Sequence, residues 1–528
     1  MEEAHATVVL LVPKQHVKTV KSALENAGQL DKNSKITPEP KNGNSTGSNL
    51  PPTPETSGDQ DPIPEFPQLK FDVVRGEYVD PSTIDRQSQD HGNTEHQRMR
   101  ILTMISCPVD EITTEEFQTS VLDGLDLHHL AQDITFSYQM PIPSSSSSPI
   151  LKTPVQRAMK EALSKLPEGI LASVELTPEM LVCDFPDGYS FYTPMLLLPH
   201  NAFSSETWTK LLSVHAVDST LLQPMWQRVA ESVGATHVAI NAPIPLHTTA
   251  QGQENILRSP VNLTPIFGDF GPAPTPDTMA SPTAADFEEA FWVTTKQNGI
   301  RQTWAPVYTM FSRGNIREKT RILDLPSLSE PSAAVDLYAG IGYFAFSYRK
   351  SGLNGVKRVL CWELNPWSVE GLRRGAKMNG WTCHIIKEDE SPASIGSSVQ
   401  DVDFLVFQKN NETAEQDYAA MGTEHKLPVH HVNLGLLPTS TLSWKTAVAM
   451  LNQELGGWIH VHENVRASLM GNRSQEVGIE FQRLVDEHED KLGTGRQKRA
   501  FVEHAELVKM FAPALCHLVF DVHVEKLE

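Results

Sequence analysis

The sequence is short of positive charge. Its 528 residues contain 44 Lys and Arg against 65 Asp and Glu, which gives a formal net charge of −21. Such a balance is a poor global signature for a protein that binds nucleic acid. An anionic partner would have to be attracted by local basic patches rather than by the surface as a whole.

Cysteine is scarce as well. An odd count with no Cys-x-x-Cys pair makes free thiols in a reducing compartment the simplest interpretation. It also disfavours a cysteine-based metal site, so we expect no metal. The five cysteines are Cys107, Cys183, Cys361, Cys383 and Cys516.

Long apolar runs are missing too. No stretch approaches the length of a membrane span, and the acidic start, Met1-Glu-Glu-Ala-His5, is unlike a signal peptide. We therefore expect a soluble, cytoplasmic protein without a membrane partner. The length predicts two to four domains, and a hydrophobic content of 39% is enough to build their cores.

The segment 333–363 organises the rest of the chain. An apolar run ends in a small-residue loop with Gly340 and Gly342, a helix-compatible stretch follows, and a second apolar run ends on Glu363. Glycines let the backbone approach a ligand closely. A carboxylate twenty-one residues after Gly342 is suitably spaced to hold the ribose hydroxyls of a nucleoside.

The loop departs from the dinucleotide fingerprint. Phe344 and Ala345 stand where that fingerprint requires a third glycine. A single nucleoside such as S-adenosylmethionine (SAM) therefore fits better than NAD. A βαβ turn without a ligand is the alternative.

The chain predicts four segments. Residues 1–37 form a small N-terminal module, 38–66 a Pro-rich linker, 67–285 an α+β middle region, and 286–528 a doubly wound α/β domain. Polar insertions are expected near 389–400 and 408–428 of the last segment. Its expected strands are 333–337, 358–363, 383–387, 402–407, 457–461 and 515–524.

Ligands of a doubly wound sheet bind at the carboxyl ends of its strands. Asp336 and Glu363 would lie there, and so would the turn 387–390, where Asp389 or Glu390 could accept from an adenine amino group. A solvated acidic turn is nearly as good an interpretation of 387–390. Asn433 follows in the segment 432–440, which is otherwise read as a core strand ending at Pro438.

Two further clusters remain open. His460-Val-His-Glu-Asn464 would place both histidines on one strand face and Glu463 on the other, and polar residues at a strand end are favoured over a metal site. Cations gather in 312–321 and in the basic loop 493–499. Either set could contact an anion or be a solvated surface.

Taken together, these segments resemble the tRNA wybutosine-synthesising protein 2 family. The resemblance covers 6–36 and 290–528 well, and 67–250 only loosely. Its motifs are Asp-Leu-Tyr-Ala-Gly-Ile-Gly (336–342), Met-Phe-Ser-Arg-Gly-Asn-Ile-x-Glu-Lys (310–319), Glu-x-Asn-Pro (363–366), Asn-Leu-Gly-Leu-Leu-Pro (433–438), His-x-His-Glu-Asn (460–464) and Val-Lys-Met-Phe-Ala-Pro (508–513).

The resemblance implies a class I SAM-dependent methyltransferase-like fold. It also implies transfer of the 3-amino-3-carboxypropyl group of SAM to carbon 7 of 4-demethylwyosine, beside the anticodon of phenylalanine tRNA. The family commonly has Gly-Asp-Asn where this chain has Glu388-Asp389-Glu390. The expected SAM-binding residues are Ser312, Lys319, Asp336, Gly340, Gly342, Glu363, Asp389 and Glu390.

Asn433 and Arg313 are the expected catalytic residues, with Lys319 and Arg313 as candidates to hold the methionyl carboxylate. Positioning is the main catalytic need, because the sulfonium of SAM has three carbons open to attack. A tRNA guanosine N1-methyltransferase is the alternative, although that family usually reads Asn-Leu-Pro where Gly435 follows Leu434. A tRNA-binding protein with a vestigial SAM pocket is a third hypothesis.

Overall fold

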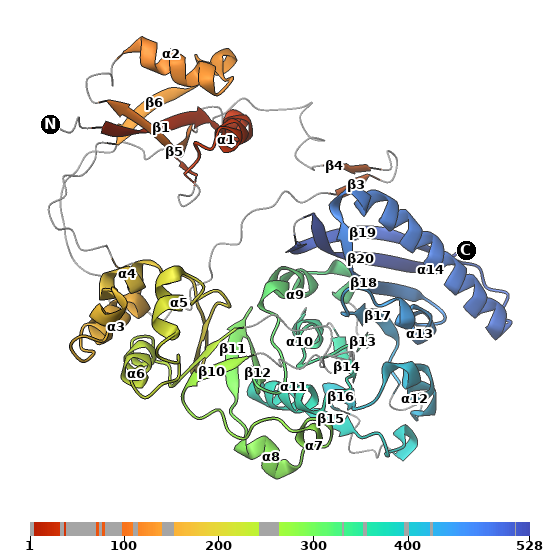
Figure 1. Ribbon diagram of the computed structural model, residues 1–528. Helices are drawn as coiled ribbons and strands as arrows, with labels where there is room; N and C mark the ends of the chain where they lie inside the picture. Colours follow the sequence, from red (N-terminus) through yellow and green to blue (C-terminus); the bar gives the residue numbers. More distant parts are fainter. Residues whose placement is uncertain are drawn as a thin grey trace, which may run out of the picture. The chain divides into compact units, whose positions relative to one another are not determined.

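The computed structural model describes residues 5–31, 36–38, 70–72, 77–79, 98–108, 114–139, 151, 153–241, 263–329, 332–351, 356–394, 401–422, 426–512 and 514–527. Their elements are labelled in Figure 1. The chain separates into two compact units, one of residues 1–65 and 85–148 and one of residues 66–84 and 149–528. None of the helices in these ranges combines the length and apolar character needed to cross a lipid bilayer. All five cysteines are free thiols, as predicted.

The first unit is an antiparallel sheet with the strand order β2-β5-β1-β6. Alternate residues of β1 point into a core that also takes Val20 and Leu24 from α1. The elements are β1 (His5–Pro13), η1 (Lys14–His16), α1 (Val17–Asn26), β2 (Thr37–Pro38), β5 (Arg98–Pro108), α2 (Glu115–Gly124), η4 (His128–Leu130) and β6 (Thr135–Gln139).

The extent of this unit differs from the prediction. A module of residues 1–37 was expected, yet β5 and β6 both pair with β1 from positions assigned to the middle region. A lone strand with one helix cannot bury its apolar face, so the module needs these distant partners. Of the predicted linker 38–66, only residue 38 lies within the described residues.

In the second unit, residues 153–241 and 263–267 form the α+β arrangement expected for the middle region. Four helices pack on a mixed sheet of order β10-β9-β8-β7, in which only the β8–β9 pair is parallel. The elements are α3 (Pro154–Leu163), η5 (Ala172–Val174), α4 (Pro178–Cys183), β7 (Ser190–Tyr192), β8 (Met195–Leu198), α5 (Glu206–Leu212), α6 (Gln223–Glu231), β9 (His237–Ile240) and β10 (Thr264–Phe267).

A hairpin joins this region to the large sheet. The Thr294 backbone donates to the Thr193 carbonyl oxygen (2.8 Å), and the Trp304 ring stacks on Phe311 with the centroids 4.4 Å apart. These contacts fix the segment that begins at Ser312. The elements are α7 (Pro276–Ala280), α8 (Ala284–Glu289), β11 (Val293–Gln297), β12 (Ile300–Trp304), η6 (Arg313–Asn315), α9 (Ile316–Leu323) and η7 (Pro326–Ser329).

The described residues of the C-terminal region form an eight-stranded sheet of order β15-β16-β14-β13-β17-β18-β20-β19. The first six strands are parallel, and β20 and β19 are antiparallel. The elements are β13 (Ser332–Asp336), α10 (Ala345–Lys350), β14 (Val356–Trp362), α11 (Pro366–Met378), β15 (Cys383–Ile386), η8 (Pro392–Ser394), β16 (Phe404–Phe407), η10 (Asn411–Thr413), α12 (Ala414–Ala420), β17 (Val429–Leu434), η12 (Thr441–Ser443), α13 (Trp444–Met450), β18 (Gly456–Arg466), η13 (Ala467–Leu469), α14 (Met470–Leu492), β19 (Lys498–Ala512) and β20 (Leu515–Lys526). A hairpin of β3 (Lys70–Asp72) and β4 (Glu77–Val79) also belongs to this unit.

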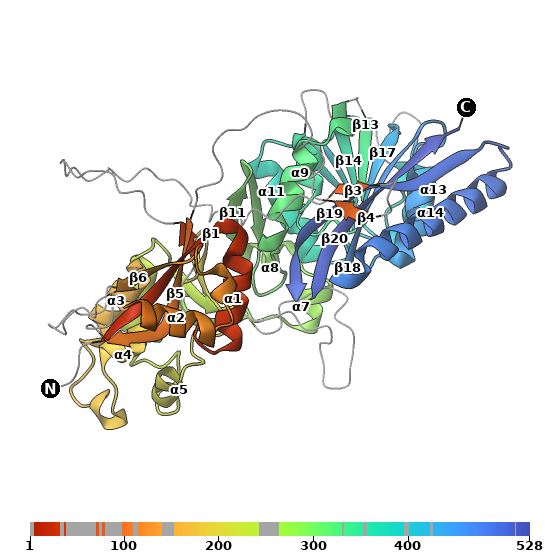
Figure 2. The ribbon, with the colours of Figure 1, turned by 90° about the horizontal axis from the view of Figure 1, so that it is seen from above.

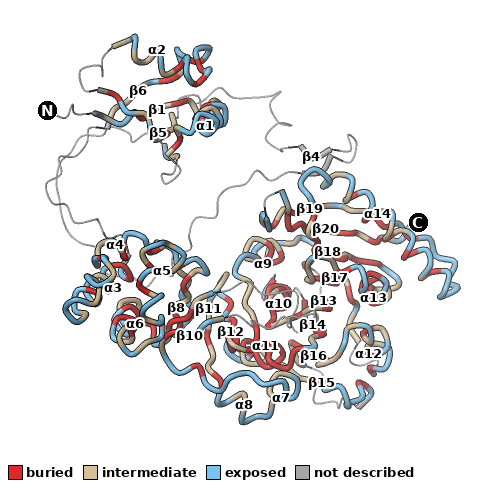
Figure 3. Tube along the Cα trace, viewed as in Figure 1, coloured by how far each residue is buried: buried red, intermediate tan, exposed pale blue. Residues whose placement is uncertain are grey.

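Helices cover both faces of this sheet, as Figures 1 and 2 show. Helices α9, α10 and α11 pack on one face, and α12, α13 and α14 on the other. The strands are apolar on both sides, so they appear almost continuously buried in Figure 3. This is the doubly wound architecture predicted from the sequence.

Two strands and one helix were missed. The sequence leaves 432–440 open between a core strand and a site segment, identifies only the basic loop 493–499 ahead of most of β19, and predicts 408–428 to be a polar insertion. The last assignment is wrong because α12 buries Ala414 in the core, with Met421 packed beside it. So few buried positions in a polar stretch give no helical period in the sequence. In the other predicted insertion, residues 395–400 lie outside the described part and 392–394 form η8.

Candidate active site

The predicted glycine loop lies at the point where the strand order reverses. β13 has β14 on one side and β17 on the other, so the segment after Asp336 opens into a crevice between two strand ends. Gly340 (φ +55°) and Gly342 (φ +87°) both adopt left-handed conformations. A Cβ on Gly340 would lie 2.5 Å from the Tyr343 ring. Glycine is therefore required there by conformation and by space.

Glu363 is bound to this loop from the neighbouring strand end. Its carboxylate accepts hydrogen bonds from the backbone N–H of Gly340 and of Asn365, both at 2.8 Å. Burial raises the pKa of Glu363, and these backbone donors oppose the rise. The acid after the second strand thus lies where the sequence predicted it, against the glycine loop.

Asp336 and Asn433 form a buried pair on adjacent parallel strands. The Asn433 side-chain amide donates to Asp336 Oδ1 at 3.1 Å, and both residues are fully buried. Asp336 Oδ2 and Asn433 Oδ1 have no hydrogen-bond partner in the described part of the chain. Burial raises the pKa of Asp336 to about 7, and the nearby Glu363 adds to this. Two buried acceptor atoms are therefore available to a donor that enters the site.

Lys319 lies on α9 and is only 2% exposed. Its ammonium donates to the side-chain oxygens of Gln297 and Gln302, both at 3.0 Å. Gln302 in turn donates to the Gly342 carbonyl oxygen (3.2 Å) and so links the cation to the glycine loop. Lys319 forms no ion pair with any described residue. Burial lowers its pKa to about 7, and the charge of Lys509 adds to the effect.

The turn before α9 carries the other cationic candidate. Ser312 is half-buried and precedes η6, and the hydroxyl of Tyr343 donates to the carbonyl of Met310. The exposed Arg313 donates from Nη1 to the Ser190 hydroxyl of β7 at 3.1 Å. The structure therefore brings Ser312 and Lys319 near the glycine loop, while Arg313 extends towards the middle region.

Asp389 and Glu390 lie in an exposed turn after β15. Glu390 Oε2 accepts from the Lys387 backbone N–H at 3.2 Å, which engages that carboxylate within its own turn. β15 is three positions from β13 in the sheet order. Among the described residues, no hydrogen bond or ion pair joins this turn to the glycine loop, so its adenine role stays a prediction.

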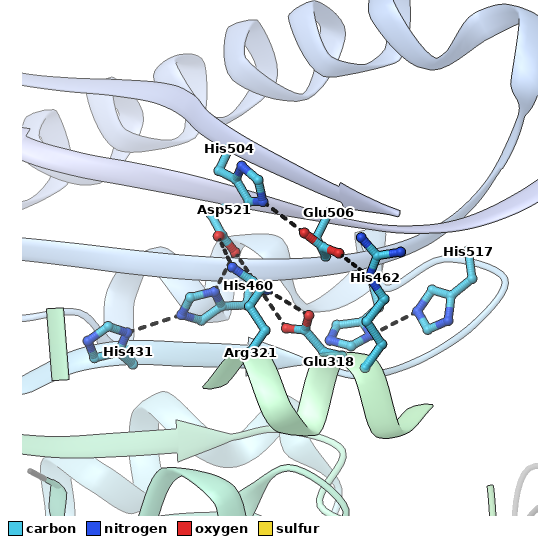
Figure 4. A network of polar contacts seen from close by, with 10 residues as sticks. Glu318, Arg321, His431, His460, His462, His504, Glu506, His517 and Asp521 are labelled. Atoms are coloured by element: carbon cyan, nitrogen blue, oxygen red, sulfur yellow. Dashed lines mark hydrogen bonds and ion pairs between the residues drawn. The ribbon is translucent and has the colours of Figure 1, made fainter. Parts of the chain in front are cut away.

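Beside the site, polar side chains of α9 meet the last three strands of the sheet (Figure 4). Arg321 binds Glu318 on its own helix and Asp521 on β20. Asp521 also accepts from His460 at 2.6 Å, and His460 contacts His431 at 3.1 Å. Arg321 and His460 hold the pKa of Asp521 well below its usual range. This buried set is internally paired.

The pair His460 and His462 shares one face of β18, as predicted. His460 is bound by Asp521 and His431, and His462 Nδ1 lies 3.0 Å from His517 Nε2. Glu463 points to the other face and binds Arg473 of α14. The expectation of strand-end residues is wrong, because β18 continues to Arg466 in its pairing with β20. No group of His, Cys, Asp and Glu among the described residues could hold a metal.

The basic loop 493–499 does not present free cations. Lys498 binds Glu489 at 2.6 Å, Arg499 binds Glu525 at 2.7 Å, and Arg496 lies 3.9 Å from Glu454. A contact with an anion is therefore disfavoured for this loop, and Lys498 is itself buried rather than solvated.

Sequence reasoning missed Gln297 and Gln302, which hold Lys319, and Lys509, whose charge acts on it. Gln302 lies seventeen residues before Lys319 in a hairpin, and Lys509 lies near the end of the chain. No local pattern links such positions. The single sequence feature that points to Lys509 is its position in the Val508-Lys-Met-Phe-Ala-Pro513 motif.

Comparison with known proteins identifies a family to which this chain is similar. Residues 293–416 match the TRM5/TYW2 methyltransferase domain. tRNA wybutosine-synthesizing protein 2 of Schizosaccharomyces pombe is 37% identical over 338 residues, which is 64% of this chain and 72% of the relative. The protein of the same name from Saccharomyces cerevisiae is 30% identical over 389 residues, with 67% and 77% covered.

A solved structure is also similar. P. horikoshii TYW2 in complex with MeSAdo aligns with a TM-score of 0.42 and 17% identity, covering 70% of this chain and 99% of that one. The family assignment rests on the two sequence relatives rather than on this structural likeness.

Proposed function

The chain belongs to the tRNA wybutosine-synthesizing protein 2 family, and on that premise we propose that it transfers the 3-amino-3-carboxypropyl group of SAM to carbon 7 of 4-demethylwyosine in tRNA. Phenylalanine tRNA as the substrate and the cytoplasm as the location are further parts of this proposal. The observation that carries it structurally is the buried, carboxylate-free Lys319 beside the glycine loop.

Glu363 and the glycine loop form the nucleoside end of the proposed SAM site. The Glu363 carboxylate is held by backbone N–H groups and stands beside Gly340, where a ribose can approach the backbone closely. The raised pKa of Glu363 fits a carboxylate that can accept further hydrogen bonds, which the hydroxyl groups of a ligand would donate. Asp389 or Glu390 would have to move towards the site to contact adenine.

The amino-acid end of SAM carries an ammonium and a carboxylate. Lys319 is a buried cation without an anionic partner in the described residues, so it suits the carboxylate. Asp336 Oδ2 and Asn433 Oδ1 are buried acceptors without partners, so they suit the ammonium. These three residues would hold both charged groups at the end of the chain that is transferred. Arg313 would assist from the outer side.

Positioning is the work assigned to these residues. SAM supplies an activated carbon chain: the bond from its γ-carbon to sulfur breaks as the bond to carbon 7 forms, methylthioadenosine leaves, and the proton of carbon 7 is released to solvent. By fixing the carboxylate and the ammonium on the α-carbon of the aminocarboxypropyl chain, Lys319 and the Asp336–Asn433 pair would aim its γ-carbon, rather than the methyl group, at the base. Tethering this chain at two points would also oppose the geometry for methyl transfer.

The alternative is a tRNA guanosine N1-methyltransferase. The chain has Leu434-Gly435 after Asn433, where that family usually has Leu-Pro. A Cβ at Gly435 would lie 3.1 Å from the Phe344 ring and 3.2 Å from Asn433 Nδ2, so a larger residue here would press on Asn433. This departure favours the aminocarboxypropyl transferase.

The test is to identify the nucleoside by-product by mass spectrometry after incubation with SAM and precursor-bearing tRNA. We expect methylthioadenosine, and less of it from the Lys319→Met variant. S-adenosylhomocysteine would make the protein a methyltransferase. Salt-dependent tRNA binding with neither product would support the binding protein with a vestigial pocket.

A further inference from the structure

The turn of the β19–β20 hairpin lies at the carboxyl ends of the parallel strands, where the SAM-site loops also lie. β20 pairs with β18 so that Leu515 lies opposite Arg466, at the carboxyl end of β18. The Ala467 backbone donates to the Ala514 carbonyl oxygen (3.0 Å) and closes this edge. We call Arg466, Lys509, Met510 and Phe511 the hairpin tip.

Two cations of the hairpin tip lie on the face that carries α9. Lys509 is opposite His517, which contacts His462, and Arg466 follows His462 by four residues on the same face. Lys509 reaches the turn before α9, because a Cβ added to Gly314 would lie 2.7 Å from its ammonium. The tip thus borders the segment of Ser312 and Arg313.

These two cations lack the partners that basic residues have at the other end of β19. Neither Arg466 nor Lys509 forms an ion pair with any residue that the structure describes. At the opposite sheet edge, Lys498 and Arg499 each bind a glutamate. In a chain with a net charge of −21, the tip therefore places two cations without ion-pair partners beside the active site.

Apolar side chains stand exposed among these charges. Phe511 is 55% exposed and Met510 is 47% exposed. Exposed aromatic rings flanked by cations are what single-stranded RNA requires, because bases stack on the ring while phosphates bind the cations. A protein partner is less suited to this mixture, since interface cores are depleted of lysine.

The hairpin is held in place relative to Lys319. Arg317 of α9 binds Glu506 of β19 at 2.6 Å, and Arg321 of α9 binds Asp521 of β20. Figure 4 shows Glu506 and Asp521 meeting α9 from the strands above it. The tip is thereby preorganised next to the SAM site, which reduces the ordering cost of binding.

We propose that the hairpin tip binds the single-stranded anticodon loop next to the target base, with Phe511 stacked on a neighbouring base and Lys509 and Arg466 on backbone phosphates. This rests on the proposed function, which makes tRNA the substrate. Lys319 is the inner cation that faces SAM, and Lys509 is the outer cation that faces RNA.

The experiment measures methylthioadenosine release by the full chain with precursor-bearing tRNA, giving KM for tRNA and for SAM separately. The variants are Phe511→Ala, Phe511→Trp, Lys509→Ala and Arg466→Ala. Arg499→Ala is the matched control, because it removes a cation from the same strand at the opposite sheet edge.

We expect Phe511→Ala to raise KM for tRNA about tenfold or more, and Phe511→Trp to restore it. Lys509→Ala and Arg466→Ala should each weaken tRNA binding and lower its salt dependence by about one counterion. SAM affinity, measured by calorimetry, should be unchanged in the Phe511 and Arg466 variants, and unchanged or higher in Lys509→Ala, because that variant removes a charge that lowers the pKa of Lys319. Arg499→Ala should match the wild type.

An unchanged KM for tRNA in Phe511→Ala and Lys509→Ala would overturn the proposal. So would a loss of SAM affinity in Lys509→Ala, which would move this lysine to the SAM site. If the wild type released no methylthioadenosine, the proposed function would fail instead. tRNA binding by filter retention would then still test the tip directly.

Discussion

Lys319 and Arg321 lie two residues apart on α9, and these cations, one buried and one mostly buried, have opposite surroundings. Arg321 donates to Glu318 from one edge of its guanidinium and to Asp521 from another. Lys319 has only two glutamine oxygens and two aromatic rings around it. The carboxylates raise the pKa of Arg321, whereas burial lowers that of Lys319 to about 7.

The difference separates a structural charge from a binding charge. A buried ion pair with satisfied hydrogen bonds fastens the helix to the sheet and has little capacity left for a ligand. A buried cation without an anion is unstable by itself and gains most from an anionic ligand. The same contrast distinguishes the paired Asp521 from Asp336, whose second oxygen has no partner in the described residues.

The largest effect should come from removing the paired cation. Arg321→Met leaves Glu318 and Asp521 as buried carboxylates without their shared cation, so we expect a loss of about 3–5 kcal/mol in the free energy of unfolding. Chemical denaturation would measure it. An unchanged midpoint would contradict the structural role of Arg321.

The unpaired cation should behave in the opposite way. Lys319→Met should lower kcat/KM for SAM by about 10- to 100-fold, since a charge-assisted hydrogen bond to the carboxylate is lost. Its stability should be unchanged or higher, because an unpaired buried charge is removed. Kinetics and denaturation on the same preparation check both. If Lys319→Met lost stability but kept its KM for SAM, Lys319 would be a structural charge like Arg321 and not a binding charge.

The pH dependence of SAM binding sharpens the comparison. Lys319 with a pKa of about 7 loses its proton as the pH rises, and Asp336 with a pKa of about 7 gains one as the pH falls. SAM needs the cation and the anion together, so affinity should peak near pH 7 and fall on both sides. Calorimetry across that range should show the alkaline limb disappear in Lys319→Met and the acidic limb disappear in Asp336→Asn.

The smallest effect is expected on the surface of α14. Arg483 pairs with Glu480 and Glu487, all three well exposed to solvent. Such pairs are screened by water and salt. Arg483→Ala should leave both Tm and SAM affinity unchanged. A clear loss of Tm would mean that burial is not what distinguishes Arg321.

Local pattern predicted much of the fold of the C-terminal domain. The strand before the glycine loop and the strand ending at Glu363 both lie within one or two residues of their predicted positions. Each is marked by an apolar run that is followed by turn residues. β19 and α12 were missed because their buried residues are too few or too irregular to give a period.

The sequence alone determined the glycine loop, Glu363 and the family motifs, because these depend on residue type and short spacing. Only the tertiary structure decided which charges are paired. Lys319 and Arg321 look alike along the chain, and their partners come from β12 and β20, far away in sequence. Electrostatics depends on distance in space and on burial, and both are set by the packing of remote segments.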